Sequence, residues 1–315
     1  MADQRIAVIA LGGNALSPAG ERSTIFDQFR HTRESLQAIV TLIQDGWRVC
    51  IVHGNGPQVG DELVRNEEAR ATVEPLPLGV LVAATAGWIG YMIQQSLENA
   101  IRAAGGRQRV ATVLTQVVVA KDDPALSHPA KFVGHELSPE RARELAAAGV
   151  ATATDGNGRV RRVVGSPVPV EIHEQSVVQA LLDDGVVVVA CGGGGIPVYR
   201  DASGALEGID CVVDKDLAAA VLAAAIGADL FMILTDVDAV YADWGTPAKR
   251  PLRRLTTDDV DRMDASAAFG EGSMAPKVRA AARYVRETAG RAIITELSRG
   301  SAAVAGHAGT EIVPD

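Results

Sequence analysis

The chain is predicted to adopt an α/β fold in which a parallel sheet is connected by crossover helices. Short apolar segments alternate along its 315 residues with longer amphipathic ones, as in chains that cross over between parallel strands. Several of the apolar segments end in glycine-rich turns. Apolar residues make up 47% of the sequence, enough to bury one large domain or two lobes.

The N-terminal elements follow this alternation. Residues 5–11 form a short apolar run that ends in glycines, which predicts a buried strand. Residues 26–44 carry apolar side chains on one helical stripe, and Gly46 marks the end of the predicted helix. Residues 48–52 predict the second strand. Pro57 then begins a helix at its first position, where the missing N–H group costs nothing.

The middle of the chain departs from the alternation. Residues 78–103 predict a long, mostly apolar helix, and polar residues inside it favour a buried helix over a membrane span. Residues 110–119 predict one strand. Prolines and charged residues then become frequent over residues 120–169, which indicates a small excursion from the main sheet, here called the flap.

Regular alternation resumes after the flap. Residues 173–182 predict a helix and residues 186–190 a buried strand, while Ser203-Gly204 marks the turn of a hairpin at 196–209. The remaining apolar and amphipathic segments predict a helix at 214–226, a strand at 230–234, a helix at 276–288 and a strand at 292–295.

Charge and cysteine content exclude some classes of partner and site. The net charge is −9 and no run of basic residues occurs, so neither nucleic acid nor an anionic membrane is expected as a partner. A nucleotide ligand is not excluded, because a few local cations are enough to bind one. The three cysteines share no C-x-x-C spacing, which suits a reducing cytoplasm.

Three predicted strands end in glycine clusters, within residues 12–14, 53–56 and 191–195. The carboxyl ends of parallel strands share one edge of a sheet, where ligands of open α/β folds bind. Glycine lets backbone N–H groups approach an anion closely. A single glycine pair could merely turn the chain, but three clusters at equivalent ends predict an anion cradle. No Gly-Lys pair and no dinucleotide fingerprint is present, so the familiar phosphate loops do not apply.

Lysine is rare in the chain, with five residues against twenty-five arginines, and three lysines lie among glycines, prolines or acids: Lys131, Lys215 and Lys277. Lysine supplies a compact point charge, and transfer of a phosphoryl group can use several. Lys215 stands at a predicted helix start, where it opposes the helix dipole. A residue in a locally unfavourable position often belongs to a functional site. The pattern therefore predicts an enzyme that moves phosphate.

Several neighbouring residues remain open to two interpretations. Asp214 could only cap a helix, and Lys277 could be a solvated residue of a first turn. Asp236 could orient a lysine, contact a ribose or simply serve in a turn. His53 is more easily explained by backbone bonding than by catalysis. No residues have the spacing of a protein-bound zinc site, whereas magnesium carried by a nucleotide leaves little trace in a sequence.

Six motifs, in order, closely resemble the carbamate kinase family of the amino-acid kinase superfamily: ALGGNAL, HGNGPQVG, CGGGGIPV, DKDLAA, LTDVDAVY and GSMAPKV. This resemblance implies a three-layer αβα sandwich with a mainly parallel sheet of about eight strands, a small protruding subdomain and a homodimer. It divides the chain into a carbamate- or carbamoyl-phosphate-binding lobe, residues 1–213 with the flap, and a nucleotide-binding lobe, residues 214–315.

The same resemblance implies roles for individual residues. Lys215, Lys277 and Lys131 would contact phosphate, and Asp216 would organise the lysines. The acceptor would be bound by residues of the first two glycine clusters: Gly12, Gly13, Asn14, Gly54, Asn55 and Gly56. ATP or ADP would be bound by residues of the later motifs: Gly193, Gly194, Thr235, Asp236, Tyr241, Met274 and Pro276. Magnesium would accompany the nucleotide, with no separate metal site.

The flap departs from the family pattern. The family usually has a proline after the flap lysine and then a Gly-Pro-Phe-Tyr run, whereas residues 131–137 here read KFVGHEL. The resemblance implies reversible phosphoryl transfer between ATP and carbamate. Because the flap would cover the acceptor, a related kinase acting on another small acid or phosphonate remains an alternative. A regulator that binds a nucleotide without catalysis is the second alternative.

Overall fold

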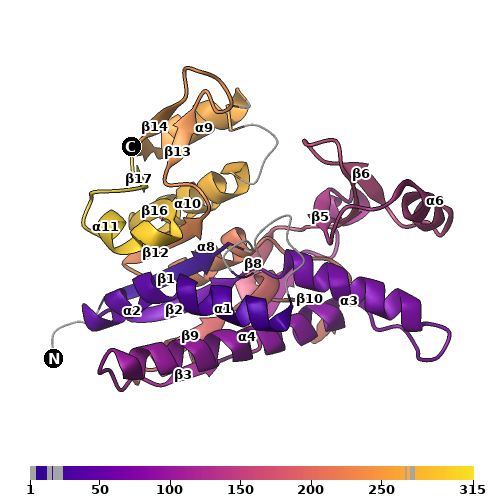
Figure 1. The fold of residues 1–315 in the computed structure, drawn as a ribbon, viewed down its shortest axis with the longest axis horizontal. Coiled ribbons are helices and arrows are strands. Elements are labelled where there is room, and N and C mark those ends of the chain that lie inside the picture. The colour runs from indigo at the N-terminus through magenta and orange to yellow at the C-terminus, as the bar shows by residue number, and fades with distance from the viewer. Residues whose placement is uncertain (1–4, 13–15, 17–23, 267, 270–273) are drawn as a thin grey trace.

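The computed structural model describes residues 5–12, 16, 24–266, 268–269 and 274–315. An eight-stranded sheet forms its centre (Figure 1). All neighbouring strands in it are parallel except β16 and β17, which confirms the predicted mainly parallel sheet. The strand order is β15 (Arg254–Thr256), β17 (Thr310–Val313), β16 (Arg291–Glu296), β12 (Leu230–Thr235), β1 (Ile6–Leu11), β2 (Arg48–His53), β9 (Val187–Ala190) and β3 (Val110–Thr112).

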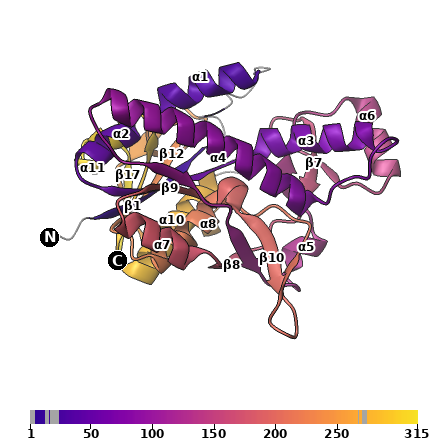
Figure 2. The same ribbon diagram turned by 90° about the horizontal axis from the view of Figure 1, so that it is seen from below.

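Helices cover both faces of the sheet and produce three layers (Figures 1 and 2). Every residue of β1 is buried, and alternate side chains enter two different apolar clusters. One cluster contains residues of α7 (Gln175–Asp183), α8 (Lys215–Ala225) and α10 (Met274–Thr288). The other contains residues of α2 (Gln37–Gln44), α4 (Leu78–Ala103) and α11 (Gly300–Val304). Burial on both faces explains why the strands read as continuous apolar runs.

The helix predicted over residues 26–44 is two helices, so that prediction was wrong. Helix α1 (Ile25–Ser35) starts with a capping box formed by Thr24 and Asp27, and α2 begins after a break at the buried Leu36. No glycine or proline marks the break, so the apolar stripe continues through it. The Thr32 hydroxyl donates a hydrogen bond to the carbonyl of Gln28, a type of contact that bends helices.

The start of the next helix differs from the prediction by one residue. Helix α3 (Gly56–Ala69) has Asn55 at its N-cap position, without a hydrogen bond from the Asn55 side chain to the helix end, and Pro57 is therefore its second residue and not its first. The amide of the second residue also lacks an intrahelical partner, so proline is equally acceptable there. The long helix α4 has the predicted bounds.

Residues 110–119 form two strands in different sheets, which corrects the single strand predicted there. Strand β3 lies at the edge of the large sheet, whereas β4 (Gln116–Val119) joins a smaller sheet. The Glu174 carboxylate accepts hydrogen bonds from both the backbone and the side-chain amide of Gln116. This contact lies at the point where the chain enters the second sheet. The smaller sheet has the order β11 (Leu206–Gly208), β10 (Ile196–Arg200), β4 and β8 (Pro169–Ile172), with β10 and β11 forming the predicted hairpin.

The flap protrudes from the main body, as predicted (Figure 1). Its centre is an antiparallel sheet in the order β5 (Lys131–Val133), β7 (Val160–Val164) and β6 (Thr152–Thr154). Two helices complete it: α5 (Pro124–Ser127) and α6 (Pro139–Ala147).

Helix α3 touches the flap where two glycine backbones meet. A Cβ atom added to Gly60 would lie 2.0 Å from the Cα of Gly134. The amide of Gly134 also donates a hydrogen bond to the carbonyl of Gly56, over 3.2 Å. No side chain fits between these two segments, so the base of the flap is fixed against α3 by backbone contact.

Some short elements were not predicted. They are β13 (Val240–Ala242), β14 (Arg250–Leu252), α9 (Thr257–Ala265) and the edge strands β15 and β17. Three-residue strands are too short to show a clear period. Among the described residues, no helix has the length and apolar character needed to cross a membrane.

Candidate active site

The ends of three neighbouring strands meet at one edge of the large sheet. The amide of Gly12, after β1, donates a hydrogen bond to the carbonyl of Leu234 in β12, over 3.0 Å. The amide of Gly54, after β2, donates to the carbonyl of Leu11 over 3.3 Å. The structure thus brings two of the predicted glycine loops together. Gly13 and Asn14 lie outside the described residues.

The third glycine cluster packs tightly against the second. Strand β9 is the neighbour of β2, and the turn that follows it, Gly192–Gly194, is buried. A Cβ atom on Gly193 would lie 2.3 Å from the side-chain nitrogen of Asn55, and one on Gly194 would lie 2.2 Å from the carbonyl of Val213. Close packing therefore requires glycine at both positions, whatever ligand contacts they also make.

Asn55 is held in a fixed orientation. Its side chain is almost fully buried, and its amide nitrogen donates a hydrogen bond to the Thr85 hydroxyl over 2.9 Å. Thr85 lies on α4 and in turn contacts backbone carbonyls of its own helix. The sequence offered no signal for Thr85, because a threonine inside an apolar helix has no distinguishing pattern. Asn55 directly precedes α3, so Gly56 lies at the N-terminus of a helix.

Three lysines converge on two carboxylates at the N-terminus of α8. Lys215 Nζ lies 2.5 Å from Oδ1 of Asp216, and Lys277 Nζ lies 3.5 Å from its Oδ2. Lys131 Nζ, from the flap, lies 2.8 Å from Oδ2 of Asp214. These lysines come from three elements that are far apart in sequence: α8, α10 and β5. The structure therefore gathers all three predicted lysines into one cluster.

Asp214 belongs to this cluster, although the sequence left it open as a cap. It does cap α8, because its Oδ1 accepts hydrogen bonds from the amides of Asp216 and Leu217 over 2.9 and 3.3 Å. Its other oxygen pairs with Lys131. Burial alone would raise the pKa of Asp214, but Lys131 and Lys215 outweigh that effect and hold the pKa well below its usual value. The sequence Asp214-Lys215-Asp216, with an aspartate on each side of the lysine, was the feature that could have indicated this role of Asp214.

Lys215 is nearly buried, and its environment contains opposing influences. Burial lowers the pKa of its ammonium group, Asp216 counteracts this by attraction, and Lys277 lowers the pKa further by repulsion. A helix N-terminus is also an unfavourable place for a cation. An anion placed beside these lysines would relieve the repulsion between them and would be favoured by the positive end of the helix dipole.

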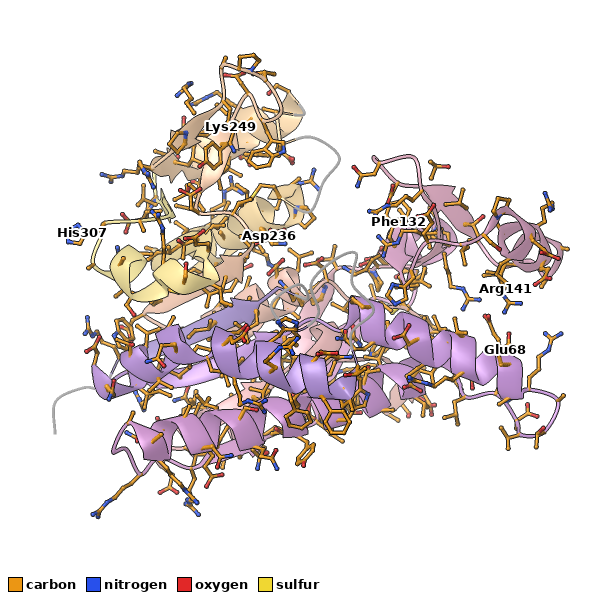
Figure 3. All side chains as sticks on the ribbon, in the orientation of Figure 1. Glu68, Phe132, Arg141, Asp236, Lys249 and His307 are labelled. Atoms are coloured by element: carbon orange, nitrogen blue, oxygen red, sulfur yellow. The ribbon has the colours of Figure 1, made fainter. Side chains whose placement is uncertain are left out.

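The residues predicted to bind the nucleoside come from the end of β12, from β13 and from the first turn of α10. Thr235 is the last residue of β12, the neighbour of β1, and Asp236 follows it (Figure 3). The Thr235 hydroxyl donates a hydrogen bond to the Asp236 carboxylate over 3.0 Å. The Tyr241 hydroxyl donates to Asp238 over 2.6 Å. Met274 and Pro276 occupy the first turn of α10, which also carries Lys277.

The aromatic ring of Tyr241 has further contacts that the sequence did not reveal. It packs against Trp244 with ring centroids 5.5 Å apart. Lys249 Nζ lies 4.2 Å from the Tyr241 ring and 4.0 Å from the Trp244 ring.

His53 is a buried neutral residue behind the glycine loops. Its Nδ1 pairs with the carbonyl of Gly54 over 3.0 Å, and its Nε2 has no hydrogen-bond partner in the part of the chain that the structure describes. Burial lowers the pKa of His53 to about 4, and the positive charge of Lys215 adds to this effect. The geometry supports the interpretation from sequence that His53 bonds to the backbone.

This lowered pKa predicts a loss of stability in mild acid. The unfolded chain takes up a proton at His53 near its ordinary pKa of 6.5, whereas the folded chain does so only near 4. The stabilisation that comes from a neutral His53 is therefore complete above pH 6.5, and it declines as the pH falls toward 4. We expect His53→Gln to reduce the loss of unfolding free energy between about pH 7.5 and pH 5 by about 2 kcal/mol, measured by urea denaturation. If the unmodified protein and His53→Gln lost the same free energy of unfolding over this pH range, the lowered pKa of His53 would be contradicted.

Among the described residues, no group of three or more His, Cys, Asp or Glu side chains is arranged to hold a metal ion. The cluster of lysines and glycine loops instead provides cations and backbone amides. Such a site is suited to phosphate-bearing ligands.

Comparison with known proteins agrees with this geometry. A model of the amino acid kinase family matches residues 5–296. The chain belongs to the amino acid kinase family. This amino acid kinase is 45% identical over 309 residues to a carbamate kinase from Halobacterium salinarum, covering 98% of each chain. It is 46% identical over 304 residues to a carbamate kinase from Escherichia coli K12, covering 96% of this chain and 97% of the relative.

Solved structures give the same result. A carbamate kinase from Giardia lamblia, bound to AMP-PNP, superposes with a TM-score of 0.91 at 36% identity over the whole of both chains. These relatives confirm the resemblance drawn from the sequence motifs.

Proposed function

We propose that this amino acid kinase is a carbamate kinase, which transfers a phosphoryl group reversibly between ATP and carbamate. The observation that carries the proposal is the convergence of Lys131, Lys215 and Lys277 beside the glycine loops after β1, β2 and β9. Similarity to carbamate kinases over nearly the full chain supports the choice of acceptor.

The reaction requires alignment and charge stabilisation. A carbamate oxygen attacks the terminal phosphorus of ATP, and the bond from that phosphorus to the oxygen bridging it to ADP breaks. Carbamate is already an anion, so no general base is needed. Lys215 and Lys277 would stabilise the charge that develops on the transferred group, with Asp216 fixing both ammonium groups.

The two substrates would approach from opposite sides of the lysines. Gly12, Gly13 and Asn14, together with Gly54, Asn55 and Gly56, would hold carbamate and the phosphate in transfer. The nucleotide would lie over Thr235, Asp236, Tyr241, Met274 and Pro276, and Gly193 and Gly194 would support its phosphates. Magnesium would enter bound to the nucleotide, as part of that substrate. The lobes meeting here would be residues 1–213 and 214–315.

The proposal extends to assembly and compartment. Apolar side chains are exposed on α1 and α4, including Phe26 and Tyr91, and the family resemblance implies that two copies pair. Helices α1 and α4 are in contact through Phe29 and Tyr91, so this surface is continuous (Figure 2). Cys50, Cys191 and Cys211 are free thiols, which suits a cytoplasmic enzyme.

A coupled assay tests the proposed reaction directly. Purified protein with carbamoyl phosphate, ADP and magnesium should produce ATP, detected through hexokinase and glucose-6-phosphate dehydrogenase. Acetyl phosphate in place of carbamoyl phosphate should give much less ATP, because it lacks the amino group. The divergent residues 131–137 of the flap make this comparison informative. Activity only with another small acid or phosphonate would favour the related kinase, and nucleotide binding without any turnover would favour a regulator.

A further inference from the structure

Helix α3 contacts the flap at a second place, farther from the sheet than the glycine contact. There the Glu67 carboxylate binds two arginines of the flap. Its Oε2 accepts a hydrogen bond from Arg141 in α6 over 2.7 Å, and its Oε1 accepts one from Arg162 in β7. Arg141 also pairs with Glu144 of its own helix. Figure 3 shows Arg141 on the flap facing the end of α3, where Glu68 is labelled.

This contact is partly shielded from water. The Glu67 side chain is 23% exposed and that of Arg162 only 11%. Charge-assisted hydrogen bonds of this kind are roughly twice as strong as neutral ones. Ion pairs on an open surface contribute much less. The Glu67 contact can therefore hold α3 and the flap in a fixed relation.

The flap is incompletely packed against α3 at this point. A cavity of about 220 Å³ remains between them, lined by residues that include Leu63, Val133 and Leu137. Val133 also joins a small buried cluster with Val59 of α3 at the base of the flap. Apolar packing thus secures the base, whereas the outer part is held mainly by the two arginine contacts of Glu67, with a longer contact of 3.9 Å between Arg141 and Glu68.

A short covalent and hydrogen-bonded path joins Glu67 to Lys131. Arg162 in β7 is paired with Val133 in β5, and Lys131 in β5 is paired with Val164. Neighbouring antiparallel strands are locked by their ladder of backbone hydrogen bonds. Because Gly134, next to β5, is fixed against α3, we expect a shift of β7 to tilt β5 about that point and to displace Lys131 from Asp214 at the N-terminus of α8.

We propose that Glu67 is a positioning residue for Lys131, acting through Arg162 and the β7–β5 ladder. The proposal rests on the proposed function, because it treats Lys131 as a phosphate ligand. The hydrogen bonds of Glu67 go to Arg141 and Arg162, and neither carboxylate of the lysine cluster is its partner. Its effect on the reaction passes entirely through the placement of β5.

The matched variants are Glu67→Gln and Glu62→Gln. Both glutamates lie on α3 and are similarly exposed, 23% and 25%, but Glu62 pairs with Arg65 of its own helix. We expect Glu67→Gln to lower kcat/KM by between about 10- and 100-fold, since small misplacements of a catalytic group have effects of this size. Glu62→Gln should leave it nearly unchanged. Equal activity of the two variants would overturn the proposal.

A double-mutant cycle with Lys131→Ala separates positioning from a general loss of stability. If Glu67 acts through Lys131, adding Glu67→Gln to Lys131→Ala should cause no further loss of kcat/KM. Independent, multiplying losses would show that Glu67 acts in another way. Thermal unfolding of each variant verifies that it is folded, and Arg162→Gln provides the same comparison from the flap side.

Hydrogen exchange gives a readout that does not need activity. Amides of residues 131–133 and 160–164 should exchange faster in Glu67→Gln than in Glu62→Gln, with α4 unchanged in both. Unchanged exchange in β5 and β7 would refute the role of Glu67 even in a fully active enzyme. If the unmodified protein does not make ATP from carbamoyl phosphate, the proposed function fails, and the exchange data still decide whether Glu67 holds the strand of Lys131.

Discussion

Lys215→Ala should lower kcat by roughly 100- to 1,000-fold, the size of effect seen when one electrostatic contact to a transition state is removed. Lys215 Nζ lies 2.5 Å from Oδ1 of Asp216, and both side chains are nearly buried. A cation from solvent therefore cannot easily replace the lost ammonium group. The substituted enzyme should remain folded, because Asp216 keeps its contact with Lys277. Steady-state kinetics in the ATP-forming assay measure the change.

Lys121→Ala is the control for this substitution. Lys121 is exposed, and its Nζ lies 4.5 Å from the centre of the Tyr199 ring, on the smaller sheet. Its loss removes a lysine without altering the cluster, so kcat should be unchanged. Lys215→Arg should not restore activity, since a planar guanidinium does not replace a compact ammonium group. Normal turnover of Lys215→Ala would refute its role.

Asp216→Ala should destabilise the fold by about 3–5 kcal/mol as well as abolish most activity, because two buried lysines then lose their shared carboxylate. The side chains of Lys215 and Lys277 are only 11% and 9% exposed, and that of Asp216 only 3%. Water therefore compensates poorly for the missing charge. Urea denaturation at neutral pH measures the loss.

Asp264→Ala serves as the comparison for stability. Asp264 accepts two hydrogen bonds of 2.7 Å from Arg279, but this pair lies near the surface. Its removal should cost at most about 1 kcal/mol. If Asp216→Ala and Asp264→Ala unfold at the same urea concentration, the two lysines do not depend on Asp216 in the way described.

The central sheet could be predicted because each of its strands and helices has a recognisable pattern of apolar residues within a short stretch of sequence. Strands covered on both faces are continuous apolar runs, and crossover helices carry one apolar stripe, so β1, β2, β9, β12 and β16 were all expected. Changes inside an apolar segment could not be predicted. Neither the break at Leu36 nor the switch of sheets after β3 is marked by glycine or proline.

The candidate site could be predicted where the chemistry is written into short motifs. The glycine loops and the three unusual lysines indicated an anion site, and the structure gathers these lysines on Asp214 and Asp216. Contacts between distant residues could not be predicted in the same way. Thr85 orients Asn55 from 30 positions away, and Glu67 meets Arg162 from 95 positions away. An ordinary helical threonine or glutamate gives no sign of such a partner.

The backbone contact between Gly60 and Gly134 has a consequence for how this enzyme can vary. A joint made from main-chain atoms does not depend on the identity of the side chains around it. Substitutions on either side of Gly134 should therefore leave the attachment of the flap to α3 intact. The sequence of the flap can vary without loss of this contact, provided that these two positions stay without side chains.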